Sequence, residues 1–518
     1  MLAVAAHPTR TLVRLGGLLA AAAVMLGGPV AALAHGLSPT YQSPLPLAVY
    51  LVGAAATVAL SFVFVLARDM RAAPAAPGQV APVPGFVRLG LRAIGLAGWL
   101  WIMAQGIAGG SSDAAVAGLF LWVYGWVGIA ILSALVFPVW EWLDPFTTLH
   151  DIGVWGLRRA GVRGWAPSPL PRGARLWPAA IGFAFFIWLE LAAVPGNAEL
   201  TLILAGYTVL TLALMAQYGR DTWRAAGETF SIWFRTLNRL AAIGVVPAPV
   251  AGDGSEADPD AVDGRSVLRR PFASGLLIGS WETPRIILVA FGTGSIIFDG
   301  LSQTVAFASV FGAPALLARS LLLFAFLGII AAAALVVART VSPGAIGAGL
   351  LPIATGYLVA HYLTYLLIDG QRILIAVSDP LQQGSDLFGT AFFEPAAGWL
   401  PPGLVWTAQL VAVVGGHMLG AWAGHVTAQR DMDAAAFPYG NGNGNGNGNG
   451  GKAGRDLRHR KIHDPDPLPG PRRNVRMREI PLAIVMVALT TLTLWSLGQA
   501  IVVEEESASM PAAVARAG

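Results

Sequence analysis

The chain of 518 residues contains no cysteine, which excludes disulfide bonds, thiolate metal ligands and cysteine nucleophiles. Charged residues are scarce as well: Asp, Glu, Lys and Arg make up 12% of the sequence, about half of their share in soluble domains. Hydrophobic residues make up 55%. This composition predicts an integral membrane protein whose main partner is the lipid bilayer.

Several enzyme signatures are missing too. The sequence contains no G-x-S-x-G nucleophile elbow, no H-E-x-x-H metal pair and no Walker phosphate loop. The formal net charge of +4 is small, and most basic residues are concentrated in a few segments between apolar runs. Such clustering sets the orientation of membrane helices and gives no reason to expect a nucleic-acid partner.

Ten apolar runs have about the 20 residues that a helix needs to cross a bilayer. The sequence therefore predicts an all-α fold, a polytopic transmembrane bundle of about ten spans plus an N-terminal signal segment. The predicted spans are Leu45–Ala67, Arg88–Gly109, Ala115–Val136, Trp177–Val194, Leu200–Gln217, Pro284–Thr304, Ala315–Ala338, Ile346–Ile368, Leu404–Ala428 and Ile480–Val502.

Residues 1–34 have the pattern of a secretory signal. Arg10 and Arg14 precede an apolar run, and Ala32-Leu33-Ala34 is typical of a cleavage site. Cleavage would leave His35 at the mature N-terminus, where its amine and ring can chelate copper. The alternatives are that His35 merely follows the cleavage site, or that the segment stays attached as one more helix.

Loops rich in Arg and Lys alternate along the chain with loops that contain almost none of these residues. The positive-inside rule then predicts a multi-pass protein of the bacterial plasma membrane with its mature N-terminus outside. The predicted organisation is spans one to five in 35–218, a cytoplasmic amphipathic helix and acidic linker in 219–283, spans six to nine in 284–428 with an outer loop at 369–403, a flexible Asn-Gly linker and basic segment in 429–479, and span ten with an outer tail in 480–518.

Two aromatic segments are expected at the inner boundary. Arg220–Ala242 has helical spacing with Trp233 and Phe234 on its apolar side, which predicts a helix lying on the membrane surface. Trp140–Phe146 reads as an aromatic belt, in which Asp144 followed by proline caps the next helix.

Four ionisable residues are predicted at a similar depth on four different spans. At a rise of about 1.5 Å per residue, Glu190, Asp299 and His361 fall in the outer half of the membrane, and His417 falls near its middle. An ionisable group at membrane depth is costly and indicates function by default. Helix-to-helix hydrogen bonds and, for Glu190, a position near the headgroups are the structural alternatives.

Two imidazoles and two carboxylates are a competent ligand set for a divalent metal such as zinc or copper. We therefore predict His361, His417, Asp299 and Glu190 as metal ligands, with His35 as a separate copper ligand. A metal-bound water would supply hydroxide near neutral pH, so Asp299, His361 and His417 are also the predicted catalytic residues.

Phrases along most of the chain resemble a family of bacterial polytopic membrane proteins labelled fenitrothion hydrolase. The resemblance implies hydrolysis of an organophosphorus triester at its aryl–oxygen–phosphorus linkage, and it carries over no catalytic residues. The phrases are Ala34-His35-Gly36 with Pro44-Leu45-Pro46-Leu47, Gly227-Glu228-x-Phe230, Phe298-Asp299-Gly300, Pro352-Ile353-Ala354-x-Gly356-Tyr357 with Ala360-His361-Tyr362, Ser378-Asp379-Pro380, Asp386-Leu387-Phe388-Gly389-Thr390, Gly416-His417 and Gly424-His425.

Three functions therefore stay open at this point. The first is a hydrolase that takes a hydrophobic small molecule from lipid into a polar, metal-binding site. The second is a metal or small-molecule carrier, in which the same side chains relay protons or ions. The third is a subunit of a larger membrane complex, whose protein partners the sequence does not name.

Overall fold

A computed structural model describes residues 78–109, 114–162, 166–171, 173–247, 262–436 and 479–497. Seven helices in this part of the chain are long and apolar enough to cross a membrane, and two shorter apolar helices cover Trp177–Ala193 and Ile480–Ser496. The described chain is thus mostly helical, with apolar helices of membrane-spanning length, while the predicted count of ten spans stays a prediction. The signal segment and the predicted span Leu45–Ala67 lie outside the described residues.

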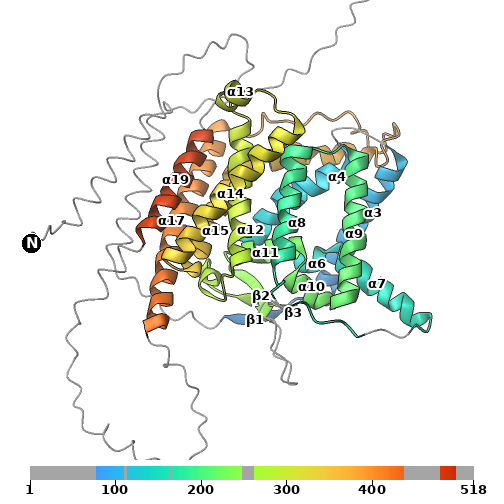
Figure 1. Cartoon of the computed structure of the whole chain (residues 1–518). Helices are drawn as coiled ribbons and strands as arrows, with labels where there is room; N and C mark the ends of the chain where they lie inside the picture. The colour runs from blue at the N-terminus through green and yellow to red at the C-terminus, as the bar shows by residue number, and fades with distance from the viewer. Residues whose placement is uncertain are drawn as a thin grey trace, which may run out of the picture.

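Figure 1 shows the elements in order. The apolar helices of the bundle are α3 (Gly85–Ala108), α4 (Val116–Gly118) continued by η1 (Leu119–Ile129) and α5 (Ala130–Leu135), α8 (Trp177–Trp188) continued by η2 (Leu189–Ala193), α9 (Asn197–Tyr218), α12 (Thr283–Ser302), α14 (Leu316–Thr340), α15 (Pro343–Ile368), α17 (Pro402–Ala436) and α19 (Ile480–Leu497). The connecting helices are α6 (Trp140–Leu143), α7 (Pro145–Arg159), α10 (Arg220–Ala226), α11 (Thr229–Asn238), η3 (Ser274–Leu277), α13 (Val305–Phe311), η4 (Asp369–Arg372) and α16 (Ile373–Ser378).

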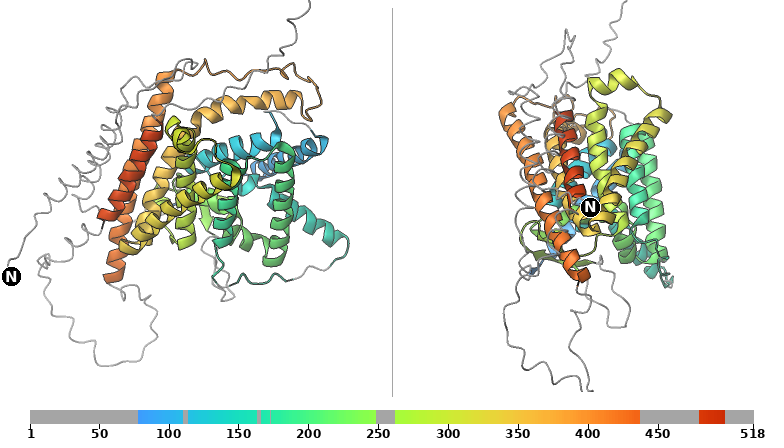
Figure 2. Two further views of the ribbon diagram at one scale, coloured as in Figure 1. Left: turned by 45° about the horizontal axis from the view of Figure 1, so that its top comes forward. Right: turned by 60° about the vertical axis from the view of Figure 1, so that its left-hand side comes forward.

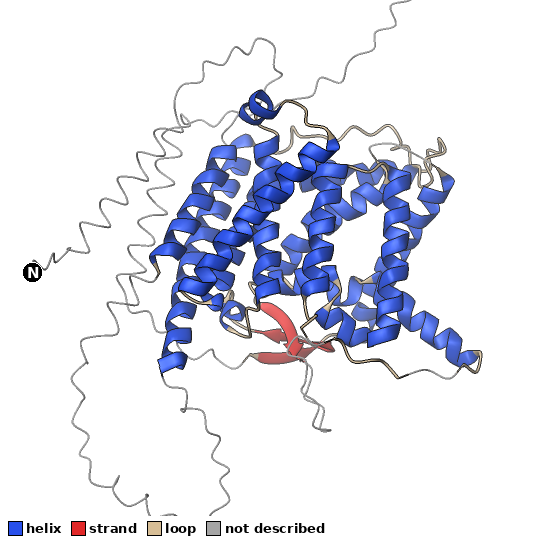
Figure 3. Ribbon diagram, viewed as in Figure 1, coloured by secondary structure: helices blue, strands red, loops and turns tan. Residues whose placement is uncertain are grey.

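The expectation of a purely helical chain is wrong in one place (Figure 3). A small antiparallel sheet has the order β1-β3-β2, from β1 (Gln79–Pro82), β3 (Val262–Arg269) and β2 (Ile243–Pro247). β3 begins inside the segment predicted as an acidic linker. Its partner β1 lies more than 180 residues earlier, so the local sequence carries no sign of the pairing.

The sheet lies at one end of the bundle, together with α7 and α10 (Figure 1). We call this the sheet end. The opposite end holds the beginnings of α4 and α9 and the end of α15. The positive-inside prediction places the sheet end in the cytoplasm.

Glycines allow the closest helix contact in the molecule, between α15 and α17. A Cβ on Gly416 would meet the carbonyl oxygen of Pro352 at 2.5 Å, and Gly356 and Gly420 are blocked in the same way by backbone of the partner helix. Small residues that let two backbones approach are a usual means of packing membrane helices. Helix α19 packs beside α17 at the edge of the bundle (Figure 2).

The segment 220–242 differs from the predicted surface helix. It breaks at Gly227, and the carboxylate of Glu228 caps α11 by accepting hydrogen bonds from the backbone N–H groups of Phe230 (3.1 Å) and Ser231 (2.6 Å). Helix α11 is buried against α5, α8 and α6, with Trp233 and Arg235 inside the protein. Amphipathic spacing alone cannot distinguish a membrane surface from a protein groove.

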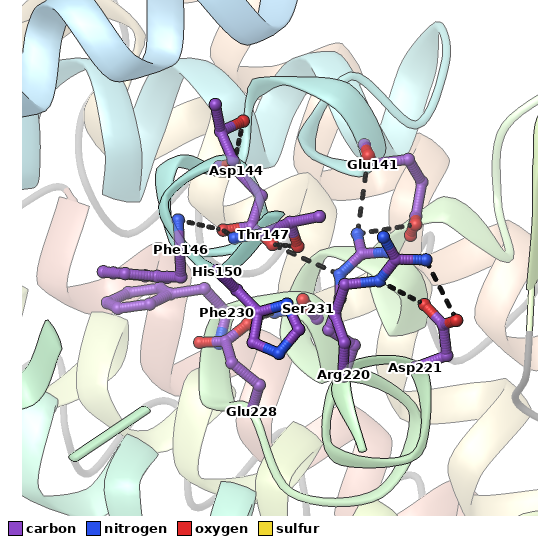
Figure 4. A network of polar contacts seen from close by, with 12 residues as sticks. Glu141, Asp144, Phe146, Thr147, His150, Arg220, Asp221, Glu228, Phe230 and Ser231 are labelled. Carbon is purple, nitrogen blue, oxygen red and sulfur yellow. Dashed lines mark hydrogen bonds and ion pairs between the residues drawn. The ribbon is translucent and has the colours of Figure 1, made fainter. Parts of the chain in front are cut away.

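This burial is possible because the basic side chains of the segment find carboxylates on α6 and next to it. Glu141 accepts from Arg235 at 2.5 and 2.9 Å and from Arg224 at 2.9 Å, while Arg224 also reaches Asp144 at 3.2 Å. Asp144 caps α7, as predicted, through Phe146 (Figure 4). The segment Trp140–Phe146, predicted as an aromatic belt, is instead largely buried in the protein, where its carboxylates pair with arginine side chains.

Candidate functional site

A hydrogen-bonded centre lies within the bundle, toward the end opposite the sheet. Oδ2 of Asp299 on α12 accepts from the hydroxyl of Tyr362 at 2.8 Å and lies 3.0 Å from Nε2 of His361 on α15. Oδ1 of Asp299 accepts from the side-chain amide of Gln303 at 2.8 Å. The side chains of Asp299 and His361 are each 15% exposed. The structure thus joins two of the four predicted residues.

Local sequence explains how the two helices come close enough. A Cβ on Gly300 would meet Tyr357 Oη at 2.8 Å, Ser496 Oγ at 3.1 Å and His361 Cε1 at 3.4 Å, so glycine is the residue that fits there. Tyr357 lies one helical turn before His361 and faces the same neighbour. The Phe298-Asp299-Gly300 phrase therefore supplies the carboxylate and the space beside it.

Glu190 approaches the centre from a third element, the π-helical segment η2. Its Oε2 is buried and accepts no hydrogen bond, and its charge interacts with Asp299, Tyr362 and Tyr365. π-Helical turns are rare and occur frequently at functional sites. The segment ends at Val194 with φ of 44°, a strained conformation for a β-branched residue.

Aromatic rings pack on one another around Tyr362. Trp126 of η1 lies 5.3 Å from Phe186 and 6.5 Å from Tyr362 between ring centroids. Tyr362 lies 6.3 Å from Tyr365, and Trp122 lies 5.1 Å from Phe186. We call Trp122, Trp126, Phe186, Tyr362 and Tyr365 the aromatic wall. Its rings come from η1, α8 and α15, the elements around the carboxylates.

A cavity of about 510 Å³ opens beside this wall, at the end of the bundle opposite the sheet. Trp122 and Tyr365 are shared by the cavity and the aromatic wall. Asp369 and Arg372 also line it and pair with each other at 3.1 Å. The remaining lining is mainly apolar, from Leu119, Val123, Pro195 and Leu200, with Asn197 at the start of α9.

His417 lies apart from this centre. It is buried on α17, and its Nδ1 lies 2.6 Å from Thr490 Oγ1 on α19. His425, eight residues further along α17, pairs with Glu479 at 2.6 Å. Helix rise predicts the height of a residue along its helix, but it says nothing about which side of the helix faces which neighbour.

Helix α19 adds polar groups that the sequence analysis missed. Thr490, Thr493 and Ser496 are buried, and Ser496 Oγ lies 2.8 Å from Tyr357 Oη. Together with Glu479, they place polar side chains along about 25 Å of helix rise, close to the thickness of the hydrocarbon core. The regular spacing of hydroxyl residues in the last span was the signal available in the sequence.

The predicted metal ligands do not assemble into a site. Within the described residues, no three His, Asp or Glu side chains are grouped so as to hold an ion. Asp299 and His361 offer two donors, whereas zinc in proteins usually has three or four protein ligands. His35 lies outside the described residues. The zinc or copper cofactor stays a prediction.

Comparison with known proteins leaves the chemistry of the site as the only guide to function. No family model, no curated protein and no solved structure matches the chain.

Proposed function

We propose that the protein is a proton-coupled membrane carrier for a small organic solute. The observation that supports this most directly is the Asp299–His361–Tyr362 centre, held at membrane depth next to a cavity at one end of the bundle. Ionisable groups inside a bundle commonly mark solute paths and proton relays. With the sheet end in the cytoplasm, as the positive-inside rule predicts, the cavity faces the outside.

The geometry suits a centre that exchanges protons. An ionised Asp299 accepts on one oxygen from both Tyr362 and the Nε2–H tautomer of His361. A proton on that oxygen turns it into a donor, so at least one of the two contacts must change. Both partners lie on α15, so protonation of Asp299 alters the contacts that hold this helix against α12.

The opposite side of the centre is closed. Between the His417–Thr490 and His425–Glu479 contacts, Leu482 and Met486 of α19 pack against α17 and α15. A carrier must have one side closed while the other is open. The cavity on one side and the apolar interval on the other fit an outward-facing form.

The hydrolase suggested by the sequence resemblance is the second candidate. His361 hydrogen-bonded to Asp299 has the arrangement of a general base oriented by a carboxylate, which activates a nucleophilic water in many hydrolases. In this reading a lipophilic ester enters the cavity from the membrane. The polar side chains along α19, which extend toward the sheet end, have no role in such a reaction. We therefore rank the carrier above the hydrolase.

One experiment distinguishes the two. Proteoliposomes with wild-type protein, Asp299→Asn, His361→Gln or the control Glu394→Gln, a change in an exposed loop, are given a mixture of small organic solutes with and without a proton gradient. Mass spectrometry then identifies what accumulates. Release of the nitrophenol from fenitrothion is followed in parallel.

A carrier accumulates a solute only with the gradient, and loses this in the two centre variants but not in the control. Hydrolysis lost in the same two variants, without any accumulation, establishes the enzyme instead. If wild-type protein shows neither activity, or if both centre variants behave like wild type, the carrier proposal is overturned.

A further inference from the structure

We infer that the cavity and the groups behind it bind a lipophilic organic cation, with Glu190 as its counter-charge. This inference rests on the proposed carrier, for which it names the class of solute.

The charge balance around the cavity is the first observation. Arg372 is paired with Asp369, and Asp299 has His361 beside it. Glu190 forms no ion pair within the described residues, and its buried Oε2 accepts no hydrogen bond. An isolated carboxylate charge inside a membrane protein is costly, so the group takes up either a proton or a cation. A cation bound near Glu190 would compensate this charge, whereas an anion would not.

The aromatic wall is the second, independent observation. Cations are attracted to the faces of Trp, Tyr and Phe rings, most strongly when water is excluded. Trp122 and Tyr365 line the cavity itself, and they contact Phe186 and Tyr362 of the aromatic wall. A cavity of about 510 Å³ is far larger than an inorganic cation, and its lining combines polar and apolar surface. An organic cation with apolar substituents uses both the walls and the charge.

The local backbone is consistent with a built site. Glu190 lies in the first turn of η2, and Trp122 and Trp126 lie in η1, so the carboxylate and two rings of the aromatic wall all lie in π-helical segments. The strained Val194 follows immediately. Such irregular backbone inside a membrane protein is tolerated where it lines a cavity or is buried in protein.

The test uses two ions of the same shape and opposite charge, tetraphenylphosphonium and tetraphenylborate. Binding to the purified full chain in a neutral detergent is measured by isothermal titration calorimetry. We expect the wild-type protein to bind the phosphonium cation at least about tenfold more tightly than the borate anion. Equal affinities, or preference for the anion, overturn the inference without any variant.

Variants then assign the counter-charge. Glu190→Gln should weaken phosphonium binding by about tenfold or more, while Glu199→Gln removes an exposed carboxylate near the same end of the bundle and should leave it unchanged. Tyr365→Leu keeps an apolar side chain in the cavity wall but removes a ring, and should weaken the cation and not the anion. If Glu190→Gln does not fold, Tyr365→Leu still decides whether the wall recognises charge.

The outcome is separable from that of the carrier proposal. Phosphonium binding without any gradient-dependent accumulation would retain the cation site and overturn transport. Gradient-dependent accumulation of neutral or anionic solutes, with no phosphonium binding, would retain transport and overturn the cation site.

Discussion

Replacing Glu141 by Gln tests whether a buried charge network holds the sheet end together. The carboxylate accepts three hydrogen bonds, two from Arg235 and one from Arg224. Its side chain is 3% exposed, and the two guanidinium groups are 7% and 8% exposed. Glutamine has nearly the same shape but no charge, so the variant leaves the network with one uncompensated positive charge where water cannot solvate it.

The size of the effect follows from the pKa of Glu141. Burial by itself would raise this pKa, but the charges of Arg235 and Arg224 and their hydrogen bonds outweigh burial and lower it to about 2, from an ordinary value of 4.5. The difference corresponds to about 3 kcal/mol of preferential interaction with the charged form. Measured losses on breaking one side of a buried ion pair are about 3–5 kcal/mol. We expect a loss of about 3 kcal/mol in the free energy of unfolding.

The assay is unfolding of the purified protein in mixed micelles by a denaturing detergent, followed by far-ultraviolet circular dichroism. Glu394→Gln, at an exposed loop position, is the matched control and should stay within about 0.5 kcal/mol of wild type. The double variant Glu141→Gln with Arg235→Gln should recover part of the loss, because the excess positive charge is gone. A loss for Glu141→Gln no larger than that of the control would refute the reasoning.

Three further predictions concern pH, helix packing and orientation. Because the folded-state pKa of Glu141 is lowered, its contribution to stability is complete above a pH of about 4.5 and should disappear as the pH falls to about 2; unfolding curves for wild type and Glu141→Gln should therefore converge in that range. Gly416→Ala should destabilise the protein by about 1–3 kcal/mol, since its Cβ would lie 2.5 Å from backbone oxygen, whereas the adjacent Gly415→Ala has open space and should be neutral in the same assay. Because the chain has no cysteine, single cysteines report topology cleanly: Gly398→Cys should react with an impermeant maleimide on intact cells, and Gly153→Cys only after lysis, while the reverse pattern would invert the predicted orientation.

The sequence by itself determined that the chain forms a membrane bundle and where most spans begin and end. Hydropathy is a local property, since a run of about 20 apolar residues is stable in lipid as a helix regardless of its neighbours. Depth along a helix is also local, so Asp299 and His361 were correctly expected at one height. The cap on α7 followed in the same way from Asp144 before proline.

Lateral partners were decided by tertiary structure alone. Asp299 and His361 are 62 residues apart, and Glu141 and Arg235 are 94 residues apart. A residue's height does not fix the direction in which its side chain points, which is why His417 contacts α19 instead of joining the centre. The amphipathic pattern of 220–242 was likewise compatible with a membrane surface and with a protein interior. The carboxylates on α6 and at its C-terminal cap made burial in protein the more stable of the two, because a buried charge must have a partner.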